Sequence, residues 1–255
     1  MENYGQFAHI AENYRRVQEN IENALARRRA GKGPVRLLAA TKTVPPEEIL
    51  FAKEVLGLDL IGENKTVELV EKYPLLEGKI EQHFIGHLQT NKVRQVVGRV
   101  SMIESVDSLR LAEEISRRST ALGITTDILV EVNSGREENK GGVLPEETYA
   151  AVRDFGALPG IRVRGLMTMA PVCDNIEDSR KYFRETYAIF IDIFEKNTHN
   201  IIEPVLSMGM SSTYAIAIEE GATEVRVGQA IFGRRQYPDK NGGKKVNSTF
   251  TLGEV

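Results

Sequence analysis

Eight short apolar segments, each followed by a helical stretch, set the fold class of this chain. Their residues are too continuously apolar for strands with one face in water, which is typical of parallel strands covered by helices. The pattern predicts the α/β class and a single (β/α)8 barrel of the TIM type, although an open doubly wound sheet would give a similar pattern. The predicted strands are Val35–Ala40, Leu58–Ile61, His83–Ile85, Ser101–Ile103, Ile128–Val132, Val163–Met167, Pro204–Met208 and Val225–Val227.

Helical patterns fill the intervals between these strands. An additional amphipathic helix is predicted in front of the first strand, from Tyr4 to Arg29, and the segment Gly31-Lys-Gly-Pro34 ends it. We divide the chain into an N-terminal helix that packs on the barrel (residues 1–33), the barrel itself (34–237) and a polar C-terminal tail (238–255). The predicted helices between strands are Pro46–Val55, Lys65–Tyr73, Lys92–Val97, Ser108–Leu122, Pro145–Phe155, Asn175–Asn197 and Ser211–Glu220.

The composition restricts the class of protein and its partners. The chain has 255 residues, of which 41% are hydrophobic, and this suffices for one sizeable core. The net charge of -3 gives no support to a nucleic-acid or anionic-membrane partner. Cys173 is the only cysteine, so no internal disulfide is possible and a reducing compartment is indicated. No run approaches the ~18 apolar residues of a membrane span, and we expect a soluble cytoplasmic protein.

One lysine stands at the outgoing end of the first predicted strand. Lys42 lies in the segment Ala39-Ala-Thr-Lys-Thr-Val-Pro45, and Pro45 cannot continue a strand ladder. The outgoing ends of the strands form the functional face of such barrels. A lysine amine there can attack an aldehyde, provided that its surroundings favour the neutral amine. The alternative is an ordinary lysine that extends from a strand end into solvent.

The other end of the predicted pocket has the features of a phosphate site. Ser207, Ser211 and Ser212 follow the seventh strand, and Ser211 or Ser212 fits the N-cap of the next helix. Gly228 follows the eighth strand and lets the backbone approach a ligand closely. Barrels of this type frequently bind phosphate between these two loops. The alternative is routine helix capping and a turn glycine. Together, an amine and a phosphate site suit pyridoxal 5'-phosphate (PLP).

Arg226 projects to the same side of the eighth strand as Gly228 and needs an acceptor. A pyridine nitrogen is one candidate, and a salt bridge to Glu224 or Glu63 is the alternative. His83 and His87 have zinc-like spacing, but they lie across a strand and a turn without the glutamate of a metalloprotease motif. We therefore predict no metal site, although His87 can still line the pocket.

Six segments in this order resemble the pyridoxal phosphate homeostasis proteins. The resemblance implies a PLP barrel similar to the N-terminal domain of alanine racemase, with Lys42 as the Schiff-base lysine and Arg226 at the pyridine nitrogen. It also implies phosphate contacts from Gly228, Gln229, Ser207, Ser211 and Ser212, and a ring environment formed by Asn64, His87 and Met167. The segments are Ala39–Pro45, Gly62–Asn64, His83–Lys92, Gly165–Pro171, Leu206–Ser211 and Val225–Gly233.

The resemblance also implies a function. We expect a protein that carries or buffers PLP and so maintains vitamin B6 and amino-acid homeostasis, without robust catalysis. Alanine racemase has a second domain that supplies a tyrosine base, and we expect this chain to lack it. Its expected partners are PLP and PLP-dependent apo-enzymes, and a monomer is expected. The alternatives are a PLP-dependent amino-acid racemase of narrow specificity and a cofactor-free Schiff-base aldolase.

Overall fold

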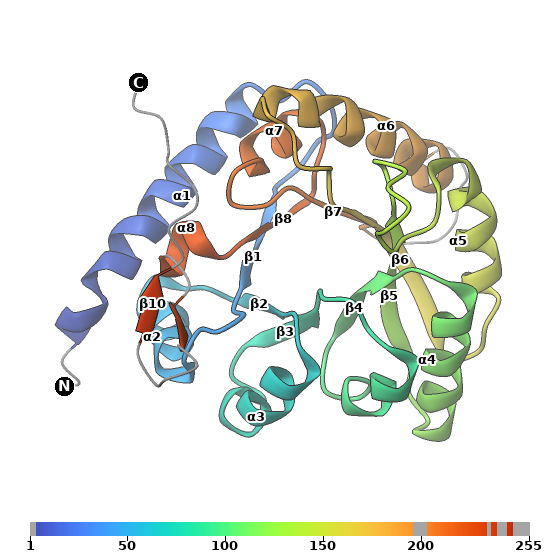
Figure 1. Cartoon of the computed structure of the whole chain (residues 1–255), viewed down its shortest axis with the longest axis horizontal. Coiled ribbons are helices and arrows are strands. Elements are labelled where there is room, and N and C mark those ends of the chain that lie inside the picture. Colours follow the sequence, from blue (N-terminus) through green and yellow to red (C-terminus); the bar gives the residue numbers. More distant parts are fainter. Residues whose placement is uncertain (1–3, 196–202, 234–235, 239–243, 247–255) are drawn as a thin grey trace.

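Eight parallel strands close into a barrel in the order of the sequence (Figure 1). The computed structural model describes residues 4–195, 203–233, 236–238 and 244–246. Strand β8 pairs with β1, so the sheet has no open edge. The predicted barrel is therefore confirmed, and the alternative of an open doubly wound sheet is excluded. The strands are β1 (Arg36–Ala40), β2 (Leu60–Glu63), β3 (Glu81–Phe84), β4 (Met102–Val106), β5 (Thr126–Val132), β6 (Ile161–Thr168), β7 (Val205–Met208) and β8 (Glu224–Val227).

Helices surround the barrel on its outside (Figure 1). Two segments differ from the prediction. The segment after β3 forms a 3-10 helix (Thr90–Gln95) in place of an α-helix, and the helix after β7 begins at Tyr214, so neither Ser211 nor Ser212 is its N-cap. The α-helices are α2 (Pro46–Leu56), α3 (Thr66–Leu76), α4 (Leu109–Ala121), α5 (Thr148–Gly156), α6 (Arg180–Phe190), α7 (Tyr214–Glu219) and α8 (Gln229–Phe232).

The predicted N-terminal helix is present as α1 (Ala8–Ala26), after a 3-10 turn at Tyr4–Phe7. It packs against α7 and α8, and its buried residues Ile10, Val17, Ile21 and Ala24 form one apolar face. Polar contacts fix the same face, since the Asn13 amide donates to the Ile231 carbonyl (3.1 Å). Helix α1 is thereby attached to α8, which follows β8.

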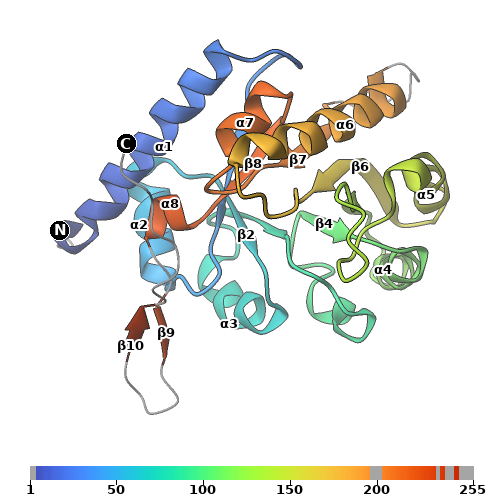
Figure 2. The same cartoon turned by 45° about the horizontal axis from the view of Figure 1, so that its top comes forward.

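The C-terminal part contains a short antiparallel pair, β9 (Gln236–Pro238) and β10 (Lys244–Val246). Figure 2 shows this pair projecting from the side of the barrel that carries α2 and α8. The rest of the predicted tail lies outside the described residues, so the division at residues 33 and 237 stays an interpretation. In the part of the chain that the structure describes, no helix is long and apolar enough to cross a membrane.

The barrel interior differs in composition from the layer between strands and helices. The outer layer is a continuous apolar core that includes Leu37, Ala39, Val225 and Val227. The alternate residues of the same strands point inward, because side chains alternate across a strand. Two small apolar clusters, Leu38 with Leu60 and Ile85, and Met102 with Leu129 and Met167, fill part of the interior. The remaining interior positions include buried charged residues, which define the candidate site below.

The close approach of β6 to β7 requires a glycine at position 165. A Cβ atom there would lie 1.8 Å from the Val205 carbonyl oxygen. Gly165→Ala should therefore lower the free energy of unfolding by about 1–3 kcal/mol or more. Gly156→Ala is the matched control, since its Cβ would meet nothing closer than Val163 at 3.8 Å. Urea unfolding measures both, and equal stability of the two variants would contradict this packing.

Candidate functional site

Lys42 lies in a tight turn at the mouth of the barrel. Strand β1 ends at Ala40, the Thr41 N–H still donates to the Gly62 carbonyl (3.0 Å), and the Val44 N–H closes the turn on the Thr41 carbonyl (2.9 Å). The Lys42 side chain is half-buried. Among the described residues, none forms a hydrogen bond or ion pair with its amine. The amine is thus available to a ligand at the outgoing ends of the strands, as the sequence predicts.

The pairing of β1 with β8 brings the predicted phosphate end next to this turn. Leu38 pairs with Arg226 and Ala39 with Val227, so Gly228 follows beside Ala40. A Cβ atom on Gly228 would lie 2.7 Å from the Ala40 carbonyl oxygen and would fill this space. Lys42 is two residues beyond Ala40. The lysine and the glycine therefore lie just beyond the ends of two neighbouring strands, at the same mouth of the barrel.

The loop after β7 contributes a hydroxyl to the same place. Backbone N–H groups of Gly228 and Ala230 both donate to Ser211 Oγ, at 3.3 and 3.4 Å. Two N–H groups that converge on one oxygen are the arrangement that an anionic oxygen also requires. Ser211 is half-buried, whereas Ser212 and Gln229 have exposed side chains. The converging N–H donors therefore belong to Gly228 and to α8, whereas the helix after β7 contributes none of them.

Arg226 lies inside the barrel below Gly228. It is 5% exposed, and its guanidinium donates to Ser207 Oγ (2.7 Å) and to the Thr168 carbonyl (2.8 Å). Both acceptors are uncharged. Within the described residues, no carboxylate forms an ion pair with this arginine, so the alternative of a salt bridge to Glu224 or Glu63 is not found. The guanidinium retains donor capacity toward the centre of the barrel.

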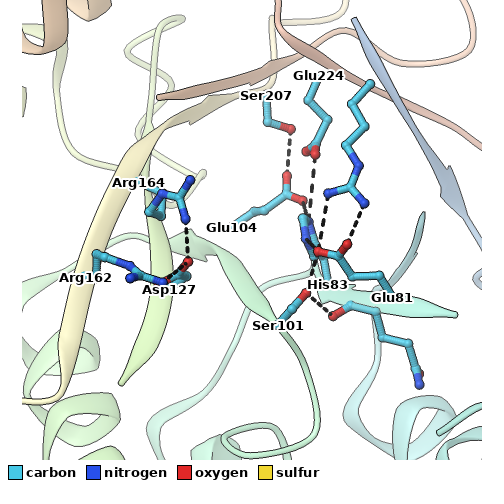
Figure 3. A network of polar contacts seen from close by, with 11 residues as sticks. Glu81, His83, Ser101, Glu104, Asp127, Arg162, Arg164, Ser207 and Glu224 are labelled. Atoms are coloured by element: carbon cyan, nitrogen blue, oxygen red, sulfur yellow. Dashed lines mark hydrogen bonds and ion pairs between the residues drawn. The ribbon is translucent and has the colours of Figure 1, made fainter. Parts of the chain in front are cut away.

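Polar side chains form a connected chain across the barrel, from Ser207 through Glu104 and His83 to Glu81 (Figure 3). Ser207 donates to Glu104 Oε2 (2.7 Å), and the other oxygen of Glu104 lies 2.7 Å from His83 Nδ1. His83 Nε2 lies 3.1 Å from Glu81 Oε1. Ser207 is fully buried, so its hydroxyl serves to connect Arg226 and Glu104. Its predicted contact with a phosphate stays a prediction, and in this structure its partners are protein groups.

Burial and charge determine the protonation of this chain. Burial alone would lower the pKa of His83, but hydrogen bonds to Glu104 and Glu81 raise the pKa of His83 to about 10. Burial tends to raise the pKa of Glu104, yet the His83 contact and the Arg226 charge hold the pKa of that carboxyl below its usual value. Burial and the neighbouring Glu104 raise the pKa of Glu224 to about 8. At neutral pH, His83 is an imidazolium, Glu104 a carboxylate and Glu224 a neutral acid.

The two histidines of the zinc-like spacing lie in different places. His83 is buried inside the barrel, whereas His87 is exposed and its Nδ1 lies 3.3 Å from Asp107 Oδ2. His83, Glu104 and Glu224 place ligand-type atoms within 4.8 Å of one another. The 2.7 Å contact between His83 and Glu104 is the length of a hydrogen bond with a proton between the two atoms. We therefore interpret this group as a proton-bridged ion pair.

The remaining predicted residues divide between two sides of the mouth. Asn64 follows β2 and is half-buried, and Met167 lies in the interior cluster of β4, β5 and β6. His87 lines a polar cleft of about 540 Å³ between the segments that follow β3, β4 and β5, together with Asp107 and Arg110. Lys42, Ser211 and Gly228 gather at β1, β7 and β8. The structure thus brings the lysine and the phosphate end together and places His87 in an adjoining cleft.

Sequence and structure comparisons agree on the family. The model of the alanine racemase N-terminal domain matches residues 8–236. A pyridoxal phosphate homeostasis protein of Aquifex aeolicus (strain VF5) is 44% identical over 223 residues, which cover 87% of this chain and 96% of the relative. The chain belongs to the pyridoxal phosphate homeostasis protein family. The predicted resemblance is confirmed.

Solved structures of similar proteins agree with this family. PipY of Synechococcus elongatus PCC7942, solved with PLP bound, is 30% identical; the match covers 84% of this chain and 100% of PipY, with a TM-score of 0.70. Alanine racemase of Clostridium difficile 630 is 17% identical, with a TM-score of 0.67; the match covers 91% of this chain and 59% of the racemase. The second likeness shows the barrel fold alone.

The protonation states of His83 and Glu224 predict how the stability of the protein depends on pH. The folded protein keeps protons on His83 and Glu224 that the unfolded chain releases near pH 6.5 and 4.5. Stability should therefore fall as the pH rises toward about 8 and then about 10, by up to about 1.4 kcal/mol per pH unit for each group. Urea unfolding at pH 6, 7, 8 and 9 measures the slope.

Glu224→Gln provides the control for this dependence, because glutamine stays neutral throughout. Its unfolding free energy should vary less between pH 6 and 8 than that of the unmodified protein. Stability that rises between pH 7 and 9 would contradict the assigned protonation states.

Proposed function

We propose that this protein binds PLP through a Schiff base at Lys42 and carries or buffers the cofactor, without robust catalysis of its own. PLP supplies an aldehyde, which condenses reversibly with an amine and releases one water molecule. The observation that carries the proposal is the β1–β8 pairing, which brings an available lysine amine to a glycine whose N–H is directed at a single oxygen. The PLP-bound relative PipY supports the same ligand.

The residues present fit each part of this ligand. For the phosphate we propose the N–H groups of Gly228 and Gln229, with Ser211 and Ser212 as hydroxyl donors. The N–H groups that now donate to Ser211 show that this corner accommodates an oxygen. Charge-assisted hydrogen bonds of this kind contribute roughly 1.5–3 kcal/mol each. The phosphate is therefore expected to supply much of the affinity.

For the ring, we propose Arg226 as the donor to the pyridine nitrogen, with Asn64, His87 and Met167 around the ring. Among the described residues, the acceptors of the Arg226 guanidinium are the uncharged Ser207 hydroxyl and Thr168 carbonyl, which supports its availability for this contact. The Ser207 hydroxyl accepts a hydrogen bond from the Arg226 guanidinium, and we propose that it positions this guanidinium. Its predicted contact with the phosphate is proposed in addition. The absence of a carboxylate partner for Arg226 among the described residues is consistent with this assignment.

The same arginine argues against strong catalysis. A guanidinium can donate but not accept, so a pyridine nitrogen that it contacts stays unprotonated. An unprotonated ring withdraws fewer electrons from a bound substrate, which weakens the chemistry that racemases need. Relatives named for pyridoxal phosphate homeostasis support a carrier role in vitamin B6 and amino-acid homeostasis. We further propose a cytoplasmic monomer whose partners are PLP and PLP-dependent apo-enzymes.

Borohydride reduction followed by mass mapping tests the proposed Schiff base. The protein mixed with PLP and reduced should carry one phosphopyridoxyl group, and that group should map to Lys42. Lys42→Ala should abolish the adduct, because the other amine that reaches this turn, that of Lys72, is held by Glu63 and the Thr41 carbonyl. Lys65→Ala is the matched control, since Lys65 is exposed and pairs with Glu68 at 3.7 Å. An adduct on Lys65, Lys92 or Lys140 in the unmodified protein would overturn the assignment.

Exchange of the Cα proton of amino acids tests the absence of robust catalysis. The PLP-loaded protein in D2O should show little deuterium incorporation and no change of chirality with D- or L-amino acids. The reason is that general acid–base assistance, worth about 10²–10⁴-fold, requires a group on each face of the substrate carbon. Turnover of about 1–10³ s⁻¹ for any amino acid would reject the carrier role and favour the racemase alternative.

A further inference from the structure

The two threonines that flank Lys42 are both held by residues of β2 and α3. Thr41 Oγ1 donates to Glu63 Oε1 (2.8 Å), and the Thr41 carbonyl accepts from Lys72 Nζ (2.8 Å). On the other side of Lys42, the Thr43 N–H donates to Glu68 Oε2 (2.6 Å). The backbone on each side of the lysine therefore has a charged partner from the same neighbouring unit.

Thr43 adopts a conformation that its residue type disfavours. Its φ angle is +65°, in the left-handed region where glycine or asparagine is usual at the third position of a turn. A β-branched residue persists there only when the surrounding contacts hold it. The short hydrogen bond from the Thr43 N–H to Glu68 is one such contact. Backbone strain of this kind is concentrated at active sites and ligand sites, which favours a functional role for this turn.

Lys72 links the three partners. Its Nζ lies 2.7 Å from Glu63 Oε1 and 3.5 Å from Glu68 Oε2, in addition to its bond to the Thr41 carbonyl. The Lys72 side chain is 10% exposed and that of Glu63 is 1% exposed. A buried lysine among two carboxylates neutralises one of them and fixes the position of both. Removal of Lys72 would take away the charged partner of the Thr41 carbonyl and leave Glu63 without its ion-pair partner.

We propose that Glu63, Glu68 and Lys72 form a turn clamp, which positions Lys42 for its reaction with the cofactor aldehyde. This inference rests on the proposed function, because it takes Lys42 as the reacting amine. The clamp residues act through the backbone of Thr41 and Thr43, so they are positioning residues. The alternative is an ion-pair group that only attaches α3 to the barrel. That alternative predicts a change in stability without a selective effect on the reaction of the amine.

The rate of adduct formation distinguishes these possibilities. Lys72→Met removes the three contacts of Lys72 while it keeps the length of the side chain. After mixing with PLP in a stopped-flow instrument, this variant should form the Schiff base on the order of tenfold more slowly, or slower still, because the amine is no longer held in place. Pyridoxamine 5'-phosphate has the same ring and phosphate but no aldehyde. Its dissociation constant should change less than about threefold, because the phosphate contacts are unaffected.

Three further variants complete the experiment. Lys79→Met is the control and should react like the unmodified protein, since Lys79 is exposed and lies beyond the end of α3. Lys72→Arg keeps the charge and the donors, so it should recover most of the rate. Glu68→Ala removes the acceptor of the Thr43 N–H and is the second test if Lys72→Met does not fold, as judged by circular dichroism. It should slow adduct formation and spare pyridoxamine 5'-phosphate binding in the same way.

The outcomes separate the clamp from the proposed function. Adduct formation at the unmodified rate in Lys72→Met and Glu68→Ala would reject the clamp and leave the proposed function intact. A parallel loss of adduct formation and of pyridoxamine 5'-phosphate binding would also reject it, in favour of a structural ion-pair group. If the unmodified protein forms no reducible adduct at Lys42, the proposed function fails, and the clamp fails with it.

Discussion

The closure of the barrel between β1 and β8 is the interaction on which the candidate site depends. These strands come from opposite ends of the barrel sequence, and their register sets Leu38 against Arg226 and Ala39 against Val227. Gly228 consequently lies against Ala40, where a side chain would collide with the backbone. A shift of the register by one residue would turn Arg226 out of the barrel, because side chains alternate across a strand. Hydrogen bonding between these two strands thus determines whether the Lys42 amine and the Gly228 N–H lie at the same end of the barrel, close to each other.

The second constraint is the free-energy cost of burying charged side chains inside the barrel. An isolated ion in this interior would be costly, so each buried charge needs a partner of opposite sign or several hydrogen bonds. The chain from Arg226 through Ser207 and Glu104 to His83 satisfies this requirement by alternating donors and acceptors. Glu224 lies beside this chain, and its Oε1 is among the buried side-chain atoms that have no hydrogen bond in the described part of the protein. Burial beside Glu104 accounts for this, because a protonated carboxyl is easier to bury than a carboxylate.

The sequence predicted the barrel and its principal residues because both depend on local patterns. Short, continuously apolar segments located all eight strands within a few residues. The position of Lys42 after a strand left its role open, and the family resemblance then assigned the predicted role. Lys72 and Glu104 were not predicted. Lys72 has the appearance of an ordinary lysine on an amphipathic helix, and β4 was expected to end at Ile103, one residue before Glu104. Their roles depend on contacts across neighbouring strands and helices, which a single sequence does not reveal.

The serines illustrate the same limit at finer scale. Ser207 and Ser211 lie on either side of Gly209, and no sequence pattern separates their roles. In the structure, Ser207 lies within β7 and contacts Arg226 and Glu104, whereas Ser211 lies beyond the strand end and accepts from Gly228 and Ala230. The depth of each residue in the barrel separates the two. This difference in depth depends on where β7 ends, and the end of β7 is set by its pairing within the whole sheet.

A crystal structure of the protein with bound PLP tests the central claim most directly. The account predicts continuous electron density from Lys42 Nζ to the cofactor, the phosphate at the Gly228 N–H, and the Arg226 guanidinium at the pyridine nitrogen. Density for PLP in the cleft lined by His87 and Asp107, or a phosphate remote from Gly228, would contradict it.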